Sequence, residues 1–186
     1  QLIDTVEKFR TFFEALKKQK IFAIDLETTH TKPLKARIAG ISFSWQPREG
    51  YYIPLMTPIG TNHLDAHTVL HEIRMIVEDE NIKKIGQNIK YDLLVLRNNG
   101  IVLRGIVFDS MIASYLLNPA KRNHNLNDIA FEYLSYKTIP TTELLGSGKE
   151  QITMDMVDVE KVCQYACQDA EVAFRLAVVL ESKLRE

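Results

Sequence analysis

The chain has 186 residues, of which 46% are hydrophobic and 25% are charged, a balance that is ordinary for a folded domain with a sizeable core. Its formal net charge of −1 gives no bulk electrostatic case for tight binding to duplex nucleic acid, although this does not exclude nucleic acid as a partner. Its longest apolar runs are far too short to span a membrane.

Hydrophobic spacing and turn signals predict alternating helices and strands along the chain. Asp4 is the expected N-cap of the first helix, and Asp109 is placed to cap a later one. Helices are expected at 4–18, 67–80, 91–96, 110–117, 126–134 and 157–184, and strands at 21–26, 37–45, 50–55, 83–86 and 106–108. No linker or repeat divides these elements, so we expect one α/β domain over residues 1–186, with helices packed against a mixed sheet.

Four carboxylates and a tyrosine stand in three of these elements. Asp25 and Glu27 are two residues apart on a strand, so both side chains leave the same face. Asp92 falls in the first turn of a helix, and the four-residue spacing of Tyr165 and Asp169 puts them on one face of another. Gathered carboxylates require cations, and oxygen ligands suit Mg²⁺ or Mn²⁺. If the four converge, the pattern predicts cleavage of a phosphodiester with two metal ions.

Each pattern also has a purely structural interpretation. The strand carboxylates could form salt bridges with a neighbouring element, and an Asp at the start of a helix is favoured by the helix dipole. Asn88 could be a loop or capping residue. Tyr165 could be a packing residue and Asp169 a solvated charge, although Asp is a poor residue for the interior of a helix. The functional interpretation therefore depends on the three patterns taken together.

In order and residue type, the three patterns resemble the motifs of the DEDDy 3′→5′ exonucleases, which are D-x-E, N-x-x-F/Y-D and Y-x-x-x-D. Here they read Asp25-Leu26-Glu27, Asn88-Ile89-Lys90-Tyr91-Asp92 and Tyr165-Ala166-Cys167-Gln168-Asp169. The longer segments FAIDLETT, IGQNIKYDLLVL and YACQDAEVAFRL resemble the proofreading domain of bacterial DNA polymerase I. The resemblance extends over residues 21–184 and implies an RNase H-like fold with a mixed five-stranded sheet and flanking helices.

The resemblance also implies roles for the five residues. Asp25, Glu27 and Asp169 would hold a first divalent ion, Mg²⁺ or Mn²⁺. Asp25 would bridge to a second ion, and Asp92 would support that ion. Tyr165 would orient the attacking water, with Glu27 as the second hydrogen-bond partner of that water.

The same resemblance places the contacts with the nucleic acid at four residues: Thr28, Gln87, Asn88 and Tyr91. The expected partner is the 3′ end of single-stranded DNA, because a terminal base has to leave the duplex to reach such a site. Two positions depart from the family, since Thr31 and Thr141 stand where better-known members have an apolar Leu and a Phe that wedge against terminal bases. We therefore expect a weaker grip on single strands, because aromatic stacking contributes roughly 1–3 kcal/mol per base.

The expected function is a magnesium- or manganese-dependent 3′→5′ exodeoxyribonuclease that releases nucleoside monophosphates. The resemblance implies that it would proofread for a polymerase module located C-terminally in the parent protein. The chain begins with Gln rather than Met, which suggests a fragment of a longer protein or a trimmed chain. An RNase D-like exoribonuclease shares the five residues and is an alternative, and a non-catalytic scaffold that binds DNA is another.

The remaining expectations concern the setting of the domain. Two cysteines, Cys163 and Cys167, are too few for a disulfide framework, and the chain has no signal peptide pattern and no Asn-x-Ser/Thr sequon. These features favour a reducing interior, and the resemblance suggests the bacterial cytoplasm near the nucleoid, with an organelle as the alternative. The isolated domain is expected to be monomeric.

Overall fold

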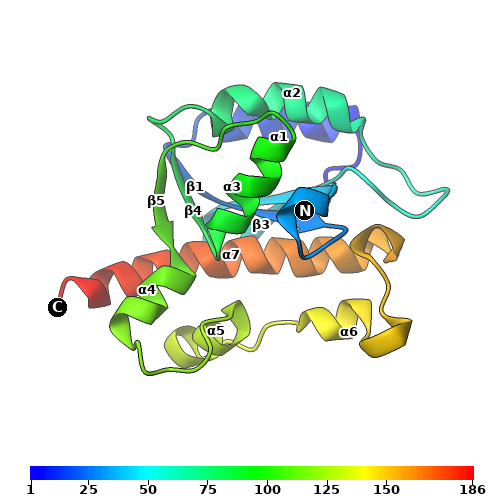
Figure 1. The fold of residues 1–186 in the computed structure, drawn as a ribbon. Coiled ribbons are helices and arrows are strands. Elements are labelled where there is room, and N and C mark those ends of the chain that lie inside the picture. Colours follow the sequence, from blue (N-terminus) through cyan, green and yellow to red (C-terminus); the bar gives the residue numbers. More distant parts are fainter.

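Five strands form one mixed sheet in the order β3-β2-β1-β4-β5 in the computed structural model, which describes residues 1–186 (Figure 1). The strands are β1 Ile21–Thr28, β2 Ile38–Gln46, β3 Glu49–Pro54, β4 Lys83–Gly86 and β5 Ile106–Asp109. Strand β1 is central: it pairs antiparallel with β2 and parallel with β4, while β3 and β5 extend the sheet on either side. The predicted α/β class and the mixed five-stranded sheet are confirmed.

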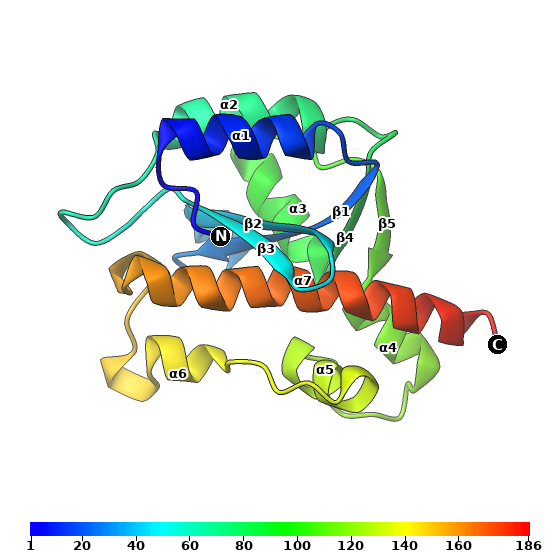
Figure 2. The ribbon, with the colours of Figure 1, turned by 180° about the vertical axis from the view of Figure 1, so that it is seen from behind.

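Helices cover both faces of this sheet. They are α1 Val6–Leu16, α2 Ala66–Val77, α3 Ile89–Asn98, α4 Ser110–Leu117, α5 Leu126–Leu134, α6 Thr141–Leu145 and α7 Val159–Leu184. Helices α1 and α2 lie on one face and α7 lies on the other, with α4, α5 and α6 on the far side of α7 (Figures 1 and 2). None of the helices combines the length and apolar character that a membrane crossing requires.

The first helix is capped by a different residue from the one predicted. The Thr5 side chain accepts a hydrogen bond from the Lys8 backbone N–H at 3.3 Å, whereas Asp4 forms an ion pair with the Lys8 ammonium group at 2.7 Å. The prediction of Asp4 as N-cap was therefore wrong by one residue. A cap depends on the backbone geometry at the helix entrance, which composition alone does not reveal.

Asp109 at the end of β5 organises the start of two helices. Its carboxylate accepts hydrogen bonds from the backbone N–H groups of Asn88 and Ile89, both at 3.0 Å, so that α3 begins at Ile89 rather than at 91. The same carboxylate accepts from the Met111 N–H at 2.9 Å and caps α4 as predicted. The Asn88 backbone has a left-handed conformation, with φ of 53°, and the Asn88 side chain makes no capping hydrogen bond. The Asp109 carboxylate caps the start of α3 instead.

The two faces of β1 have different neighbours. Phe22, Ile24 and Leu26 belong to the large core shared with α1 and α2. Ala23 packs in a separate cluster with Ala173 of α7. Since side chains alternate along a strand, Asp25 and Glu27 share the face of Ala23 and are directed towards the α7 layer.

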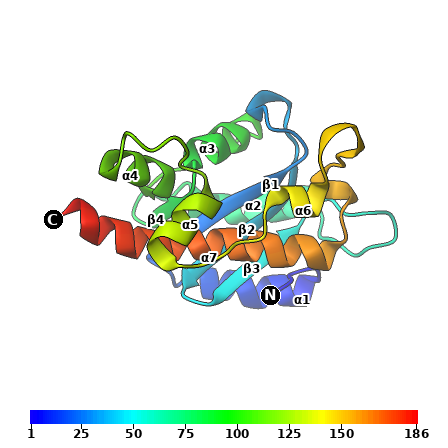
Figure 3. The same ribbon diagram turned by 90° about the horizontal axis from the view of Figure 1, so that it is seen from below.

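Small residues allow α7 to lie close to the sheet (Figure 3). Four alanines at successive turns of α7 are buried, namely Ala166, Ala170, Ala173 and Ala177. On the sheet side, a Cβ atom added to Gly50 of β3 would lie 2.6 Å from the Cys167 carbonyl oxygen. The close approach of α7 therefore depends on minimal side chains on both sides.

Enlarging one of these alanines should destabilise the fold. We expect Ala173→Leu to reduce the free energy of unfolding by about 1–3 kcal/mol, because a close-packed core resists added methylene groups. The matched control is Val178→Leu on the exposed face of the same helix, where Val178 is 64% exposed and we expect a change within about 0.5 kcal/mol. Urea unfolding would measure both, and equal effects at the two positions would contradict this packing.

Candidate active site

Strand β1 supplies the first two carboxylates of the site. Glu27 is buried and Asp25 is partly buried, on the face of the strand directed towards α7. The Oε1 atom of Glu27 is buried without a hydrogen-bond partner. Burial raises the pKa of both carboxyl groups well above the usual range, and the negative charge of Asp169 raises both further. The salt bridge of the purely structural interpretation is absent, because no Lys or Arg pairs with either side chain.

Asp92 reaches the same strand from the first turn of α3. Strand β4 pairs with β1 only from Ile21 to Ala23, so the backbone N–H of Leu26 lies beyond that ladder. The Oδ1 atom of Asp92 accepts a hydrogen bond from this N–H at 3.2 Å. Burial raises the pKa of Asp92, and the nearby Asp25 charge adds to the shift. Asp92 is thereby held beside the residue that separates Asp25 from Glu27.

Helix α7 contributes Tyr165 and Asp169 from one face. Tyr165 is 9% exposed, and its hydroxyl oxygen lies 2.8 Å from Thr141 Oγ1. Burial raises the pKa of Asp169 to about 7. The Oδ1 atom of Asp169 is buried and has no hydrogen-bond partner. The charge of Asp169 contributes to the raised pKa of both strand carboxyl groups, so the carboxylate on α7 belongs to the same acidic site as the carboxylates on β1.

The donor set fits hard divalent cations. It consists of carboxylate oxygens, the ligands that Mg²⁺ and Mn²⁺ prefer, and two of these oxygens are buried without protein partners. No three acidic, His or Cys side chains are gathered tightly enough in this arrangement to enclose an ion. A cation bound here would require the carboxylates to turn towards one another, and its charge would offset the burial and the repulsion that raise the pKa of Asp25 and Glu27.

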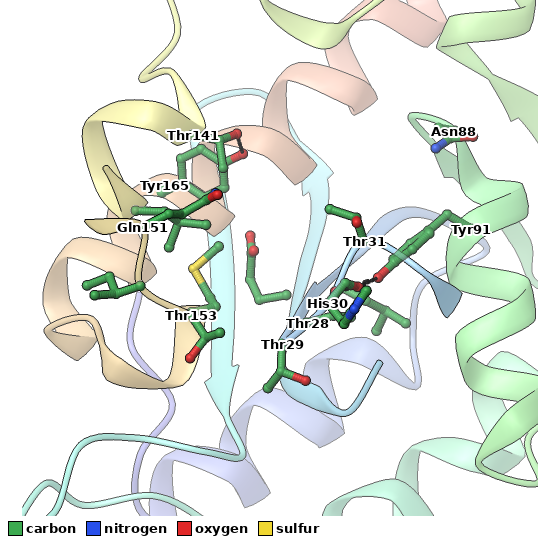
Figure 4. A pocket seen from close by; sticks show the side chains of 15 residues that line it. Thr28, Thr29, His30, Thr31, Asn88, Tyr91, Thr141, Gln151, Thr153 and Tyr165 are labelled. Atoms are coloured by element: carbon green, nitrogen blue, oxygen red, sulfur yellow. Dashed lines mark hydrogen bonds between the residues drawn. The ribbon is translucent and has the colours of Figure 1, made fainter. Parts of the chain in front are cut away.

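A cleft of about 510 Å³ opens beside this acidic site (Figure 4). Its walls come from the end of β1 and the loop that follows it, from the start of α3, and from the segment between α5 and α7. The lining residues are Leu26, Glu27, Thr28, Thr29, His30, Thr31, Asn88, Tyr91, Thr141, Leu145, Gln151, Ile152, Thr153, Met154 and Tyr165. Glu27 and Tyr165 therefore face the cleft directly, whereas Asp25, Asp92 and Asp169 lie behind its surface.

Three of the four predicted nucleic-acid contacts line this cleft: Thr28, Asn88 and Tyr91. The Tyr91 hydroxyl lies 2.6 Å from Thr28 Oγ1 and donates to the His30 carbonyl oxygen at 2.5 Å. This network fixes the loop after β1 against α3. This wall of the cleft is consequently preformed, and the cleft lining mixes polar and apolar side chains without any Lys or Arg.

The fourth predicted contact, Gln87, has its side chain bonded within the fold. It does not line the cleft, and both ends of its side-chain amide are occupied. Its nitrogen donates to the His124 carbonyl oxygen at 2.9 Å, and its oxygen accepts from the Ser110 hydroxyl at 2.5 Å. Gln87 thus ties the end of β4 to α4 and to the segment before α5, and its contact with a bound strand stays a prediction.

Other cleft residues carried no sequence motif. His30, Gln151 and Thr153 line the cleft, as does Thr141, which the sequence identified only as a departure from an aromatic position. Three of these come from the region between α5 and α7, where α6 and two short 3-10 turns replace the expected loop. Short helices of this kind have too few residues to produce a detectable hydrophobic period.

The central strand that ends in two carboxylates, with a third on α3 and a fourth beside Tyr165 on α7, defines the class as an RNase H-like nuclease domain. The sequence profile of a family described as 3′-5′ exonuclease matches residues 1–185. The chain belongs to this 3′→5′ exonuclease family, as an exonuclease domain of the DNA polymerase I type. The resemblance inferred from the motifs is confirmed.

The similar proteins with curated descriptions are much longer than this chain. DNA polymerase I of Pseudomonas aeruginosa is 34% identical over 180 residues, which are 95% of this chain and 20% of the relative. DNA polymerase I of Borreliella burgdorferi is 32% identical over 184 residues, covering 99% of this chain and 20% of the relative. The chain thus spans about a fifth of the length of these relatives.

Solved structures share the fold at lower identity. The catalytic core of RRP6 from Trypanosoma brucei matches with a TM-score of 0.73 and 18% identity, over 100% of this chain and 46% of that one. Pol1 from M. smegmatis in complex with DNA primer-template and dNTP matches with a TM-score of 0.72 and 18% identity, over 100% of this chain and 28% of that one. NrnC of Brucella melitensis with bound Mg²⁺ gives 0.68 and 23%, over 90% of this chain and 75% of that one.

Proposed function

We propose that this domain is a magnesium- or manganese-dependent 3′→5′ exodeoxyribonuclease that shortens single-stranded or frayed DNA and releases nucleoside monophosphates. The observation that carries the proposal is the pair of buried, unpartnered carboxylate oxygens of Glu27 and Asp169, close to Tyr165 and at the edge of the cleft. Unpartnered buried charges are costly unless a cation neutralises them. The Mg²⁺ named with NrnC, which shares the fold, also supports this assignment.

The place of each residue in the site determines the role that we propose for it. Asp25, Glu27, Asp92 and Asp169 would hold the divalent ions, which would supply Lewis-acid stabilisation of the attacking and leaving oxygens when bound. Glu27 and Tyr165 face the cleft, where Glu27 accepts a hydrogen bond from the attacking water and the Tyr165 hydroxyl orients that water. Thr28, Asn88 and Tyr91 hold the terminal nucleotide along the opposite wall.

The preference for DNA and the polymerase partner rest on the relatives. These relatives are DNA polymerase I proteins, and about four-fifths of their length lies outside the match. We infer that a polymerase module follows this domain in its parent protein, and the bacterial cytoplasm stays a prediction. An exoribonuclease is the second candidate, because hydroxyl side chains rather than apolar wedges stand at Thr31 and Thr141 in the cleft and can bond a ribose hydroxyl.

Digestion of an end-labelled strand tests the proposal. With 5′-labelled single-stranded DNA, we expect a ladder of products shortened from the 3′ end in the presence of Mg²⁺ or Mn²⁺, and no shortening in chelator. The same strand made of RNA, digested in parallel, separates the two candidates by their relative rates. Shortening that persists in chelator, or none with either ion, would refute a metal-dependent exonuclease.

A further inference from the structure

The hydroxyl group of Tyr165 has one hydrogen-bond partner in the structure, the hydroxyl of Thr141 at 2.8 Å. Thr141 is the first residue of α6, a helix of five residues that forms part of the cleft wall (Figure 4). The contact joins α6 to α7 across 24 positions of sequence. It connects the segment that covers the cleft to the tyrosine that faces the acidic site.

The Tyr165 ring is fixed, so the orientation of its O–H bond is the main freedom left. The ring packs in a cluster that includes Ala39, Tyr52, Met154 and Ala166, and Tyr165 is 9% exposed. A phenolic O–H can donate one hydrogen bond and also accept. Either the tyrosine donates to Thr141, which turns its proton away from the reacting groups, or Thr141 donates to the tyrosine oxygen.

Electrostatics favours the second arrangement. Asp169 stands four residues after Tyr165 on the same face of α7, and Glu27 lines the same cleft as Tyr165, so negative charge lies on the acidic side of the hydroxyl group. A hydroxyl proton turns towards negative charge, which leaves the tyrosine oxygen to accept from Thr141.

We propose that Thr141 is a positioning residue, which donates to the Tyr165 oxygen and holds the tyrosine proton towards the attacking water. The proposal rests on the exonuclease function proposed above. It gives a reason for a hydroxyl at a position where an aromatic side chain was expected from the family pattern. It also makes α6 part of the catalytic arrangement, because the helix has to be folded for Thr141 to reach Tyr165.

Kinetics of four variants tests this role. Thr141→Val keeps the shape and removes the hydroxyl, so we expect kcat to fall roughly 3- to 10-fold, the effect of one lost neutral hydrogen bond, with KM within about 2-fold. Thr141→Ser should retain the activity of the unaltered protein. Adding Thr141→Val to Tyr165→Phe should cause no further loss. Thr142→Val, at the exposed neighbouring residue of α6, is the matched control and should leave kcat unchanged.

A measurement without metal or substrate separates this inference from the function on which it rests. The ¹³Cζ NMR signal of Tyr165, identified by its loss in Tyr165→Phe, should shift in Thr141→Val and stay in place in Thr141→Ser. Two results would overturn the positioning role alone. One is a Thr141→Val variant that is as active as the unaltered protein; the other is a Thr141→Val substitution that lowers kcat by the same factor in the Tyr165→Phe variant as in the unaltered protein. An unaltered protein that degrades no strand with either ion would overturn both proposals.

Discussion

Asp169→Asn is expected to lower the rate of metal-dependent strand shortening by about 1000-fold or more. The substitution keeps the size of the side chain and removes the negative charge at a site where the neighbouring carboxylates are buried. Loss of one ligand weakens Lewis-acid stabilisation, which contributes several kcal/mol to such reactions. The measurement is the initial rate of digestion of 5′-labelled single-stranded DNA under saturating Mg²⁺, with products resolved to single nucleotides.

The matched control is Glu160→Gln, which makes the same change of charge at an exposed residue of the same helix. We expect it to retain the full rate. Equal rates for Asp169→Asn and the unaltered protein, in preparations free of contaminating nuclease, would show that the acidic site is not the site of reaction. Metal binding followed by calorimetry would then decide whether the domain is the non-catalytic scaffold.

The second expected result is that the metal-free protein loses stability as the pH rises from about 4 to above 7. The folded pKa of Asp169 is raised from 3.8 to about 7 by burial, so the folded state holds this proton more tightly than the unfolded chain does. The stabilisation is fully present below the unfolded pKa and is lost as the pH passes through the folded one. At 1.36 kcal/mol per pKa unit, the shift corresponds to up to roughly 4 kcal/mol.

Urea unfolding of the unaltered protein and of Asp169→Asn, both in chelator, measures this effect as a difference. Asn imitates the protonated acid, so the variant should gain stability relative to the unaltered protein between pH 5 and pH 8. Surface carboxyls with lowered pKa values contribute equally to both proteins and cancel; they are Asp65, Glu78, Asp79 and Glu132. A difference that is flat with pH would contradict a buried, proton-binding Asp169.

Divalent metal should restore the stability that the metal-free protein loses at high pH. A cation that binds only the folded state stabilises it in proportion to the logarithm of its concentration. At pH 8, Mg²⁺ should therefore raise the free energy of unfolding of the unaltered protein more than that of Asp169→Asn. A larger gain in the variant would argue against Asp169 as a ligand.

Local spacing in the sequence was sufficient for the parts of the site that depend on one element. The alternation of β1 places Asp25 and Glu27 on one face, and the helical period of α7 places Tyr165 and Asp169 on one face. The α5 helix was predicted at its observed bounds, Leu126–Leu134. Each of these features follows from residues within a few positions of one another, so periodicity alone reports it.

Tertiary structure decided the features that join distant residues. Asp92 enters the site through the Leu26 N–H, 66 positions away, and Asp109 sets the start of α3 from 20 positions away. The side-chain amide of Gln87 forms hydrogen bonds with Ser110 and His124 outside the lining of the cleft. Helix α6 brings the Thr141 hydroxyl to Tyr165. The four carboxylates themselves could be identified from the sequence. Their burial, raised pKa values and unpartnered oxygens arise only when α3 and α7 pack beside β1 and exclude water, and no local pattern encodes that packing.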